Sequence, residues 1–295
     1  MPRAPSRAHA SPHLLAVRHE SSHQPYFRKN HAFTKVMKHQ AFKLIYIDLF
    51  AGTGTQILSD NTENPMSGSA LRALNVRDRS FDRFVFVEND ARKIKELKKL
   101  EKEHPGRKIE IYEKDANEVL STLELGSRYR GVIFLDPYAI EIKYETLKYI
   151  ARLQSLDTWL LFPTSAVSRI LSKRKKPEQG ERKLNELFGS KIWETVYDQT
   201  YSTLNDTNVR FRRRGPGAII NLYKNQLSEL FKNRLLNKSL TLRNTKNAPL
   251  FELMFCTGSP RGIDISHNIA KHIIEYESSR DSRSALNDAQ RTLEL

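Results

Sequence analysis

Leu44-Ile-Tyr-Ile-Asp48-Leu-Phe50-Ala-Gly52-Thr-Gly54 joins a short apolar run to a turn that contains two glycines. A run this rich in β-branched and aromatic residues predicts a strand buried on both faces, as strands of parallel sheets are. Glycine lacks a Cβ atom, so Gly52 and Gly54 let the backbone turn sharply and approach a ligand closely. We interpret the turn as a candidate cofactor site. A purely structural turn is the alternative, because Gly-x-Gly after a strand is a weak signal.

Further strands are expected downstream, separated by segments with helical patterns. The expected strands cover residues 83–88, 108–112, 131–135 and 157–162. This alternation predicts an α/β fold with a parallel, doubly wound sheet. Residues 240–243 and 250–255 flank a turn and predict an antiparallel hairpin. Five parallel strands followed by a hairpin resemble the Rossmann-like sheet of class I S-adenosylmethionine-dependent methyltransferases, in which the last strand is antiparallel.

The chain divides into four expected segments. These are a disordered basic tail at 1–24, a Rossmann-like cofactor-binding core at 25–164, a basic helical insertion at 165–217, and the C-terminal part of the core at 218–295, with a helix, the hairpin and a helix. Within the core, Tyr26–Lys43 and Ser67–Leu74 have helical patterns, the second with serine available as N-cap. Gln56–Pro65 is polar and rich in turn residues, so a long loop is expected there.

Composition limits the classes of protein to consider. The 295 residues include 49 Lys and Arg against 34 Asp and Glu, a formal charge of +15 that is typical of proteins that bind a polyanion such as nucleic acid. Cys256 is the single cysteine, which excludes an intrachain disulfide framework and is consistent with a cytoplasmic setting. No apolar run approaches the length of a membrane span, and the irregularly spaced histidines predict no metal site.

Three acidic residues stand at the ends of the first three expected strands. Ligands of open α/β sheets bind beyond the carboxyl ends of the strands, so we consider these acids together. Asp48 is placed to meet the ammonium group of a methionine-derived cofactor. Glu88 has enough lone pairs to accept both ribose hydroxyls, and Asp115 can accept from an adenine amino group. The alternative for each acid is a helix N-cap.

Asp136-Pro137-Tyr138 follows the fourth expected strand directly. Amino-methyltransferases hold their target base with an Asp/Asn/Ser-Pro-Pro-Tyr/Phe motif at this position. The carboxylate and the next carbonyl accept from an exocyclic amine, and the aromatic ring stacks on the base. This chain has one proline where that motif has two, so a structural turn remains the alternative to a catalytic role.

Two basic runs lie in the expected insertion, with Trp193, Tyr197 and Tyr201 between them. Cationic side chains bind phosphates and aromatic rings stack on bases, so the insertion predicts binding to RNA or DNA. A solvated surface is the alternative. The expected nucleic-acid-binding residues are Lys173, Arg174, Lys175, Lys176, Arg212, Arg213 and Arg214.

The chain resembles the bacterial three-Cys-motif partner proteins over residues 26–276. The matching stretches are Tyr46–Gly54, Gly68–Ala70, Phe86–Glu88, Leu135–Tyr138, Phe162–Pro163 with Arg169 beyond, and Leu253–Gly258. The resemblance implies a methyltransferase-like Rossmann core, Phe50 among the cofactor-binding residues, and a partner protein encoded nearby that carries the three cysteines. Thr53 stands where the family usually has proline. Ala139 stands where it has glycine, which would be unfavourable if that turn requires a positive φ.

Two functional hypotheses follow. The first is an S-adenosylmethionine-dependent methyltransferase that acts on an exocyclic base nitrogen of RNA or DNA together with a partner protein. The second is a non-catalytic, nucleic-acid-binding partner subunit that keeps the methyltransferase-like fold.

Overall fold

The computed structural model describes residues 37, 42–58, 61–76, 80–171, 177, 179–201, 209–244 and 246–293, with the backbone alone at 55–58, 61–67, 199–201, 209–211 and 280–293. The expected tail at 1–24 and the basic run Lys173–Lys176 therefore lie outside the described residues. So does the expected helix at Tyr26–Lys43, apart from Met37 and the residues from Phe42 onward.

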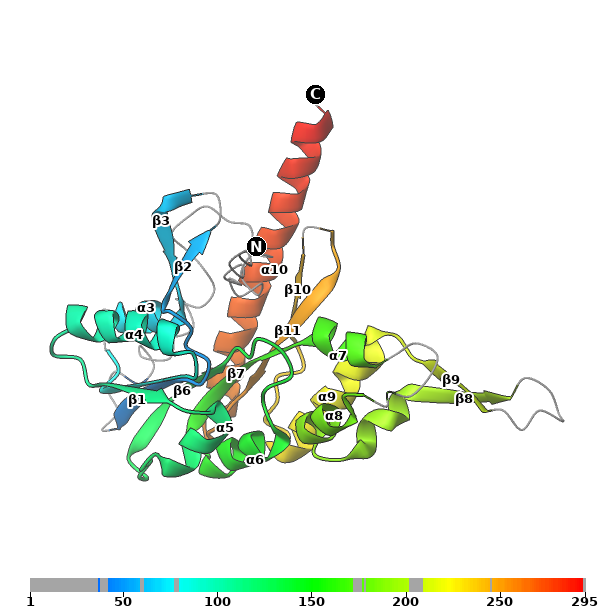
Figure 1. Cartoon of the computed structure of the whole chain (residues 1–295), viewed down its shortest axis with the longest axis horizontal. Coiled ribbons are helices and arrows are strands. Elements are labelled where there is room, and N and C mark those ends of the chain that lie inside the picture. The colour runs from blue at the N-terminus through cyan, green and yellow to red at the C-terminus, as the bar shows by residue number, and fades with distance from the viewer. Residues whose placement is uncertain are drawn as a thin grey trace, which may run out of the picture.

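A seven-stranded sheet forms the centre of the molecule (Figure 1). Its strands, in spatial order, are β10 (Leu240–Arg243), β11 (Pro249–Cys256), β7 (Leu156–Phe162), β6 (Tyr129–Leu135), β1 (Lys43–Asp48), β4 (Arg83–Glu88) and β5 (Ile109–Glu113). The five strands from β7 to β5 pair in parallel, and β11 pairs antiparallel with β7. The predicted α/β sheet of five parallel strands plus an antiparallel hairpin is confirmed.

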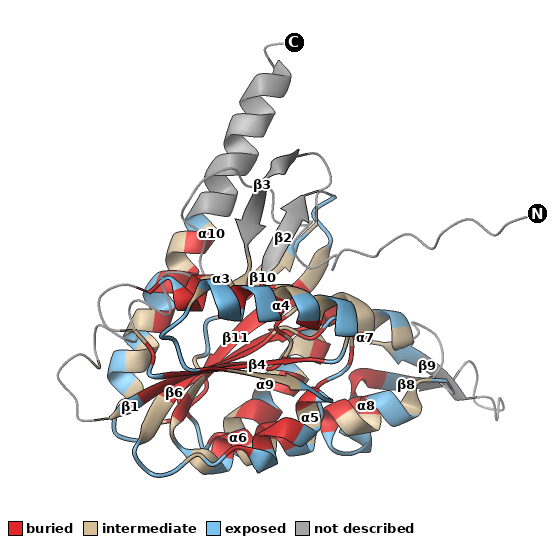
Figure 2. Cartoon of the chain, turned by 60° about the vertical axis from the view of Figure 1, so that its left-hand side comes forward, coloured by how far each residue is buried: buried red, intermediate tan, exposed pale blue. Residues whose placement is uncertain are grey.

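Helices cover both faces of the sheet (Figure 2). One face packs against α5 (Ala116–Val119), η2 (Leu120–Thr122), α6 (Tyr144–Leu153), α7 (Thr164–Ile170), α8 (Glu181–Phe188), η3 (Lys191–Val196) and α9 (Pro216–Leu230). The other packs against α3 (Ser69–Leu74), α4 (Ala91–Glu103) and α10 (Ile263–Leu293). Successive β1 residues alternate between the two cores, since Ile45 and Ile47 face the first and Leu44 and Tyr46 the second. Every residue of β1 after Lys43 is buried, as its apolar run predicts.

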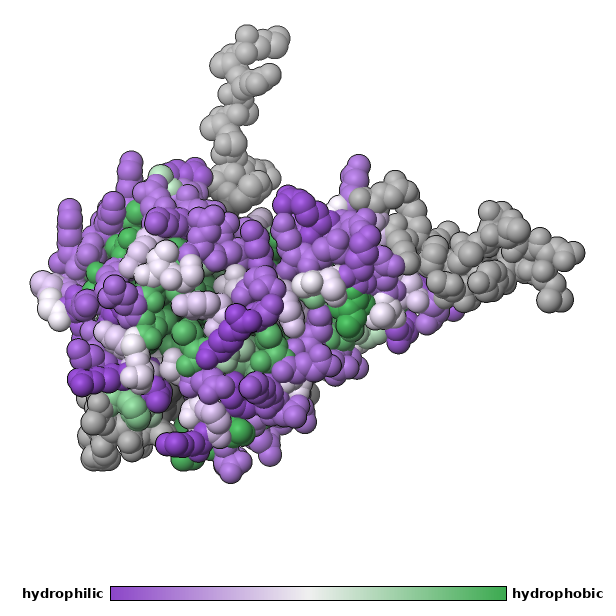
Figure 3. Space-filling view, turned by 90° about the horizontal axis from the view of Figure 1, so that it is seen from below, coloured by the Kyte–Doolittle hydropathy of each residue, from purple (hydrophilic) through white to green (hydrophobic). Residues whose placement is uncertain are grey.

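Seen from the side of α6, the surface is mainly hydrophilic, with smaller hydrophobic patches between the polar side chains (Figure 3). No helix in the described ranges is long and apolar enough to cross a membrane.

The connection after β1 differs from the expected loop. Residues Thr55–Leu58 (β2) and Asn61–Ser67 (β3) pair as an antiparallel ribbon. The sequence of this ribbon lacks the apolar alternation that marks a strand with one buried face, which is why a loop was expected. The cap of α3 also differs, because Gly68 is the N-cap and no side chain caps the helix.

The insertion at 165–217 is only partly helical. After α7, α8 and η3 the chain forms a second ribbon from β8 (Tyr197–Tyr201) and β9 (Val209–Arg213), which projects from the side of the molecule (Figure 1). A two-stranded ribbon outside the main sheet buries little apolar surface, so its sequence carries no strand pattern. The last helix, α10, runs from Ile263 to Leu293 and is the final element of the expected helix–hairpin–helix order.

An ion pair joins the amino ends of β4 and β5. Arg83 donates from Nε to Glu110 Oε1 at 2.8 Å and from Nη2 to Oε2 at 2.7 Å, a bidentate arrangement. Burial opposes ionisation of Glu110, but the hydrogen bonds and charge of Arg83 outweigh it and lower the pKa of that carboxyl. The pair therefore favours the folded state while Glu110 is ionised.

We expect Glu110→Gln to lower the free energy of unfolding at neutral pH by about 1 to 3 kcal/mol, because a charged hydrogen bond is lost. The folded pKa of Glu110 lies below its unfolded value of 4.5, so its contribution is complete above that value and disappears as pH falls through the folded pKa. Denaturant unfolding of the wild type and of Glu110→Gln, measured from neutral pH down through the folded pKa of Glu110, gives the difference in the free energy of unfolding. Glu113→Gln, an exposed position on the same strand, is the control. A difference that stays constant as the pH falls would contradict this assignment.

Candidate functional site

The predicted cofactor residues lie at one edge of the sheet. Because β1, β4, β5 and β6 are parallel neighbours, their carboxyl ends meet there. Asp48 ends β1 and pairs with Phe86 on one side and Phe134 on the other. Neighbouring strands lie roughly 4.8 Å apart, so the turn after β1 lies between the segments that follow β4 and β6. The fold thus brings together Asp48, Glu88 and Asp136.

The glycine turn has the backbone conformation that its sequence predicts. Gly52 has φ +63° and Gly54 has φ +72°, both in the left-handed region that favours glycine. The two glycines serve different purposes. A Cβ on Gly54 would meet the side chains of Leu100 and Leu97 on α4, whereas a Cβ on Gly52 would have no atom within 4 Å. Gly54 is therefore required for packing, and Gly52 borders open space that can admit a ligand.

Glu88 connects the end of β4 to the glycine turn. Its carboxylate is 7% exposed, and Oε2 accepts from Gly52 N at 3.1 Å. Oε1 accepts from the backbone N–H groups of Asn89 and Asp90 at 3.0 Å each, and Lys93 Nζ lies 3.3 Å from Oε2. Four donors thus surround this carboxylate. A ribose placed here would share the carboxylate with Lys93, the one donor that a side chain supplies.

Asp48 is completely buried at the end of β1. Its Oδ1 accepts from Phe50 N at 3.3 Å, and its Oδ2 accepts from Tyr46 OH at 3.3 Å. The carboxylate is therefore held from both sides and stabilises the first residues of the turn. Phe50 is half-buried and packs against the core under the turn.

Asp115 caps α5, the alternative that its sequence left open. Its Oδ1 accepts from Asn117 N at 2.7 Å and from Asn117 Nδ2 at 2.8 Å. The side chain is exposed, and both hydrogen bonds go to Oδ1, so the cap does not use Oδ2. A cap and a ligand contact are compatible at this residue, because a carboxylate has about four acceptor positions.

Asn117 links the segment after β5 to the segment after β6. Its Nδ2 donates to Glu141 O at 2.9 Å, and its Oδ1 accepts from Lys143 N at 2.9 Å and from Thr146 Oγ1 at 2.7 Å. Glu141 Oε2 in turn accepts from Tyr138 N at 2.9 Å. A chain of hydrogen bonds therefore runs from the Asp115 cap to the Asp-Pro-Tyr segment. The linking role of Asn117 and Glu141 cannot be predicted from the sequence, because no local pattern shows that these two turns meet.

Asp136-Pro137-Tyr138 begins immediately after β6. Pro137 is buried and Asp136 half-buried, whereas the ring of Tyr138 is 49% exposed. An exposed aromatic ring can stack on a planar ligand, and a carboxylate two residues away in the same turn can accept from an amino group of that ligand. Ala139 is not one of the residues with positive φ, so alanine fits this turn without strain.

The three predicted cations at the end of β9 and directly after it have different environments. Arg212 is exposed. Arg213 is half-buried opposite Tyr197, its partner across the ribbon. Arg214 is exposed, but it donates to Thr195 O and lies 3.6 Å from Asp198 Oδ1. Only Arg212 is exposed and outside such contacts among these three. The run Lys173–Lys176 is outside the described residues.

Two of the aromatic residues expected to stack on bases belong to the core instead. Trp193 is 1% exposed and donates from Nε1 to Asn185 Oδ1 at 2.7 Å, and Tyr197 is 7% exposed. Both residues belong to the core cluster that also contains side chains of α8 and α9, so they are not available to nucleic acid. Their sequence did not show this, because an aromatic residue between basic runs is equally typical of a binding surface and of a packed helix.

Cys256 is buried in β11, and burial raises the pKa of its thiol. No group of three or more His, Cys, Asp or Glu side chains is arranged to hold a metal ion among the residues that the structure covers.

Comparison with known proteins finds similar folds but no relative in sequence. No family model matches the chain, and no curated protein matches it either. A protein from Legionella pneumophila is 17% identical, with 71% of this chain and 93% of that chain covered and a TM-score of 0.40. An S-adenosylmethionine-dependent methyltransferase from Clostridium acetobutylicum is 11% identical, with 80% and 93% covered and a TM-score of 0.38.

An rRNA methylase from Streptococcus thermophilus is also 11% identical, with 66% of this chain and 100% of that chain covered and a TM-score of 0.31. Identities and TM-scores this low do not tell what this chain binds.

We expect Gly54→Ala to destabilise the protein more than Gly52→Ala. Both substitutions place alanine at positive φ, at a cost of roughly 1 to 2 kcal/mol. Gly54→Ala adds overpacking against Leu100, which costs about 1 kcal/mol or more. Denaturant unfolding of the two variants measures the difference. Equal losses of stability would show that α4 does not pack closely on Gly54.

We expect Asn117→Ala to loosen the segment from Tyr138 to Thr146, because the bonds to Glu141, Lys143 and Thr146 are lost together. Each bond is worth about 0.5 to 1.5 kcal/mol. Amide hydrogen exchange across this segment should accelerate. Ser121→Ala is the control, since the Ser121 hydroxyl donates to Glu118 O and does not reach that segment. Unchanged exchange in Asn117→Ala would argue against the link.

Proposed function

We propose that this chain is an S-adenosylmethionine-dependent methyltransferase that acts on an exocyclic amino group of a base in RNA or DNA. The observation that carries the proposal is the exposed ring of Tyr138, two residues after Asp136, in the segment that follows the strand next to β1 and its glycine turn, which borders open space. The resemblance to three-Cys-motif partner proteins supports a methyltransferase-like core. It also supports a partner protein encoded nearby.

The residues at the carboxyl edge suit this cofactor. The open side of Gly52 forms a cradle that a Cβ would fill, and Asp48 lies at the start of the same turn. In this arrangement the Glu88 carboxylate accepts from the ribose hydroxyls and shares this role with Lys93, and Asp115 Oδ2 accepts from the adenine amino group. Phe50 packs beneath the turn and supports it. The bound cofactor supplies the electrophilic methyl group.

Asp136, Pro137 and Tyr138 hold the base in this proposal. The Asp136 carboxylate and the Pro137 carbonyl accept hydrogen bonds from the amine, and the Tyr138 ring stacks on the base. This fixes the amine lone pair toward the glycine turn, and positioning of this kind lowers the barrier of a group transfer. The Asn117–Glu141 chain keeps the Tyr138 backbone in place. Base–aromatic stacking is worth about 1 to 3 kcal/mol.

Nucleic acid is the proposed substrate because of the net charge of +15 and the cations of the insertion, of which Arg212 is exposed in β9. Cationic side chains neutralise phosphates and release counterions, so binding should weaken as salt rises. The single proline of the Asp-Pro-Tyr segment favours the second hypothesis, a non-catalytic subunit. Ala139 does not favour it, because this turn does not need a glycine.

We expect Tyr138→Ala to lower kcat/KM for methyl transfer roughly 5- to 150-fold, the equivalent of one lost stacking contact, while Tyr138→Phe keeps most activity. The assay follows transfer of labelled methyl from S-adenosylmethionine to total RNA and DNA by the full chain. Tyr138 is exposed, so neither variant should change stability. Gly52→Ala is the matched cofactor variant, and calorimetry should show weakened binding of S-adenosylmethionine.

Full activity of Tyr138→Ala would remove this residue from the base site. Binding of S-adenosylmethionine by the wild type without transfer to any nucleic acid, with or without the partner, would instead favour the non-catalytic subunit.

A further inference from the structure

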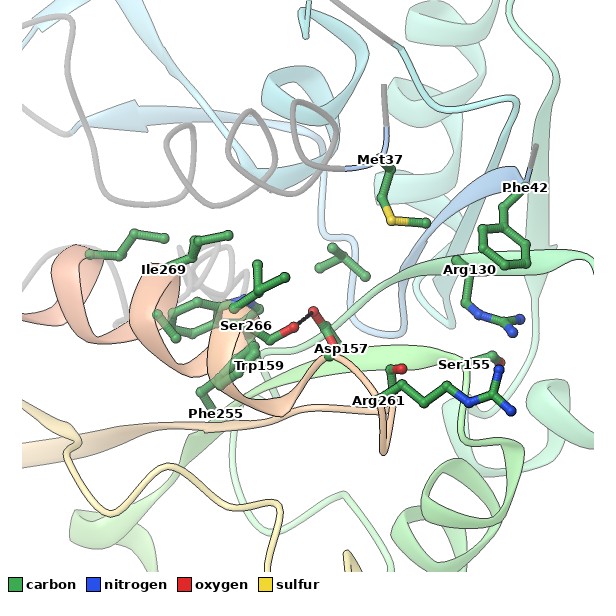
Figure 4. A pocket seen from close by; sticks show the side chains of 16 residues that line it. Met37, Phe42, Arg130, Ser155, Asp157, Trp159, Phe255, Arg261, Ser266 and Ile269 are labelled. Carbon is green, nitrogen blue, oxygen red and sulfur yellow. Dashed lines mark hydrogen bonds between the residues drawn. The ribbon is translucent and has the colours of Figure 1, made fainter. Parts of the chain in front are cut away.

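A cavity of about 450 Å³ lies between α10 and the amino-terminal halves of β6 and β7 (Figure 4). We call it the α10 cavity. Arg130 and Val132 line it from β6, and Asp157 and Trp159 line it from β7. Arg130 lies near the amino end of β6, and Asp136 of the candidate methyl-transfer site directly follows its carboxyl end. The two positions are six residues apart, which spans roughly 20 Å in an extended strand. The two sites are therefore separate, and the α10 cavity has no part in the proposed reaction.

One wall of the α10 cavity is apolar. Trp159 and Phe255 come from adjacent strands, with ring centroids 4.8 Å apart. Ile265, Ile269 and Ile273 recur every four residues along α10 and so face the same side of the helix. Pockets that bind small organic molecules usually have volumes of about 300 to 1,000 Å³ and mainly apolar walls, so the size and lining of the α10 cavity suit such a ligand.

The opposite end of the α10 cavity carries positive charge. In Figure 4 the side chains of Arg130 and Arg261 extend toward the same region, beside Ser155. Arg130 is held in place, because its Nη1 donates to Ser127 O at 2.9 Å and to Tyr129 O at 2.7 Å, and its guanidinium lies 4.3 Å above the Phe42 ring. Arg261 is exposed at the mouth.

Asp157 is the acidic residue that lines the α10 cavity, and its carboxylate is already engaged. Its Oδ1 accepts from Thr257 Oγ1 at 2.7 Å and from Gly258 N at 3.0 Å, and its Oδ2 accepts from Ser266 Oγ at 3.1 Å. These bonds hold the loop after β11 and the start of α10 against β7. The two arginines thus remain the charged groups directed at a ligand.

We propose that the α10 cavity binds a small amphipathic anion, with its carboxylate or phosphate between Arg130 and Arg261 and its apolar body against Trp159, Phe255 and the α10 isoleucines. The charge complementarity at one end and the apolar wall at the other define this class of ligand. Guanidinium groups recognise carboxylate and phosphate by the same paired hydrogen bonds, so either head group suits the site.

The test is a calorimetric titration of the full chain with decanoate, decyl phosphate and decan-1-ol, all kept below their micelle concentrations. We expect at least one of the two anions to bind about tenfold more tightly than the alcohol, because a charged hydrogen bond contributes at least that factor. The tighter anion identifies the head group.

Arg261→Gln should weaken binding of that anion about tenfold and leave binding of decan-1-ol unchanged. Ile265→Glu should weaken binding of both the anion and decan-1-ol, because it places a charge on the apolar wall. Both side chains are exposed, so neither variant should unfold the protein. The matched control is Arg182→Gln, an exposed arginine on α8 across the sheet, which should bind like the wild type.

The proposal fails if neither anion binds, if the alcohol binds as tightly as both anions, or if Arg261→Gln binds the anion like the wild type. None of these results depends on methyl transfer, so they leave the proposed function untouched.

Discussion

The hydrogen bonds of the buried Glu88 carboxylate are the interactions on which the carboxyl edge of the sheet depends. A buried charge is unfavourable unless hydrogen bonds compensate it, and Glu88 meets this condition with the backbone donors of Gly52, Asn89 and Asp90. The same bonds tie the glycine turn after β1 to the start of α4. The turn is therefore held in position by the end of the neighbouring strand. A ligand at this edge meets a surface that is already assembled, and the ordering cost on binding is small.

A second set of hydrogen bonds orders the other half of that edge. Asn117 joins the cap of α5 to the segment between β6 and α6, and Glu141 extends the link to Tyr138. The side chains of Asn117 and Glu141 thus connect the segment after β5 with the segment that holds the proposed base site. Strand β6 also contributes to the α10 cavity, through Arg130 at its amino end. One strand therefore has the candidate methyl-transfer site at its carboxyl end and the proposed anion site at its amino end.

The main sheet could be predicted because its signals are local. The parallel strands β1 and β4 are apolar runs that end at an acidic residue, whereas β5 shows alternation of apolar and polar residues. The ribbons β2–β3 and β8–β9 could not, since strands outside the sheet have no buried face to impose alternation. Trp193 and Tyr197 were misassigned for a related reason. Their residue types suit both stacking on bases and packing, and only the contacts with the surrounding helices decide between them.

The sequence by itself determined the class of fold, the order of its parallel strands along the chain and the glycine turn, because backbone conformation and burial on both faces constrain residue type directly. It also identified Asp48, Glu88, Asp115 and Asp136 as groups at strand ends. Tertiary structure alone decided which donors surround each carboxylate, that Asn117 and Glu141 connect two turns, and that Arg130 and Arg261 lie at one end of a cavity. Those contacts join residues far apart in the chain, and such pairings depend on how the strands and helices pack, which no local pattern records.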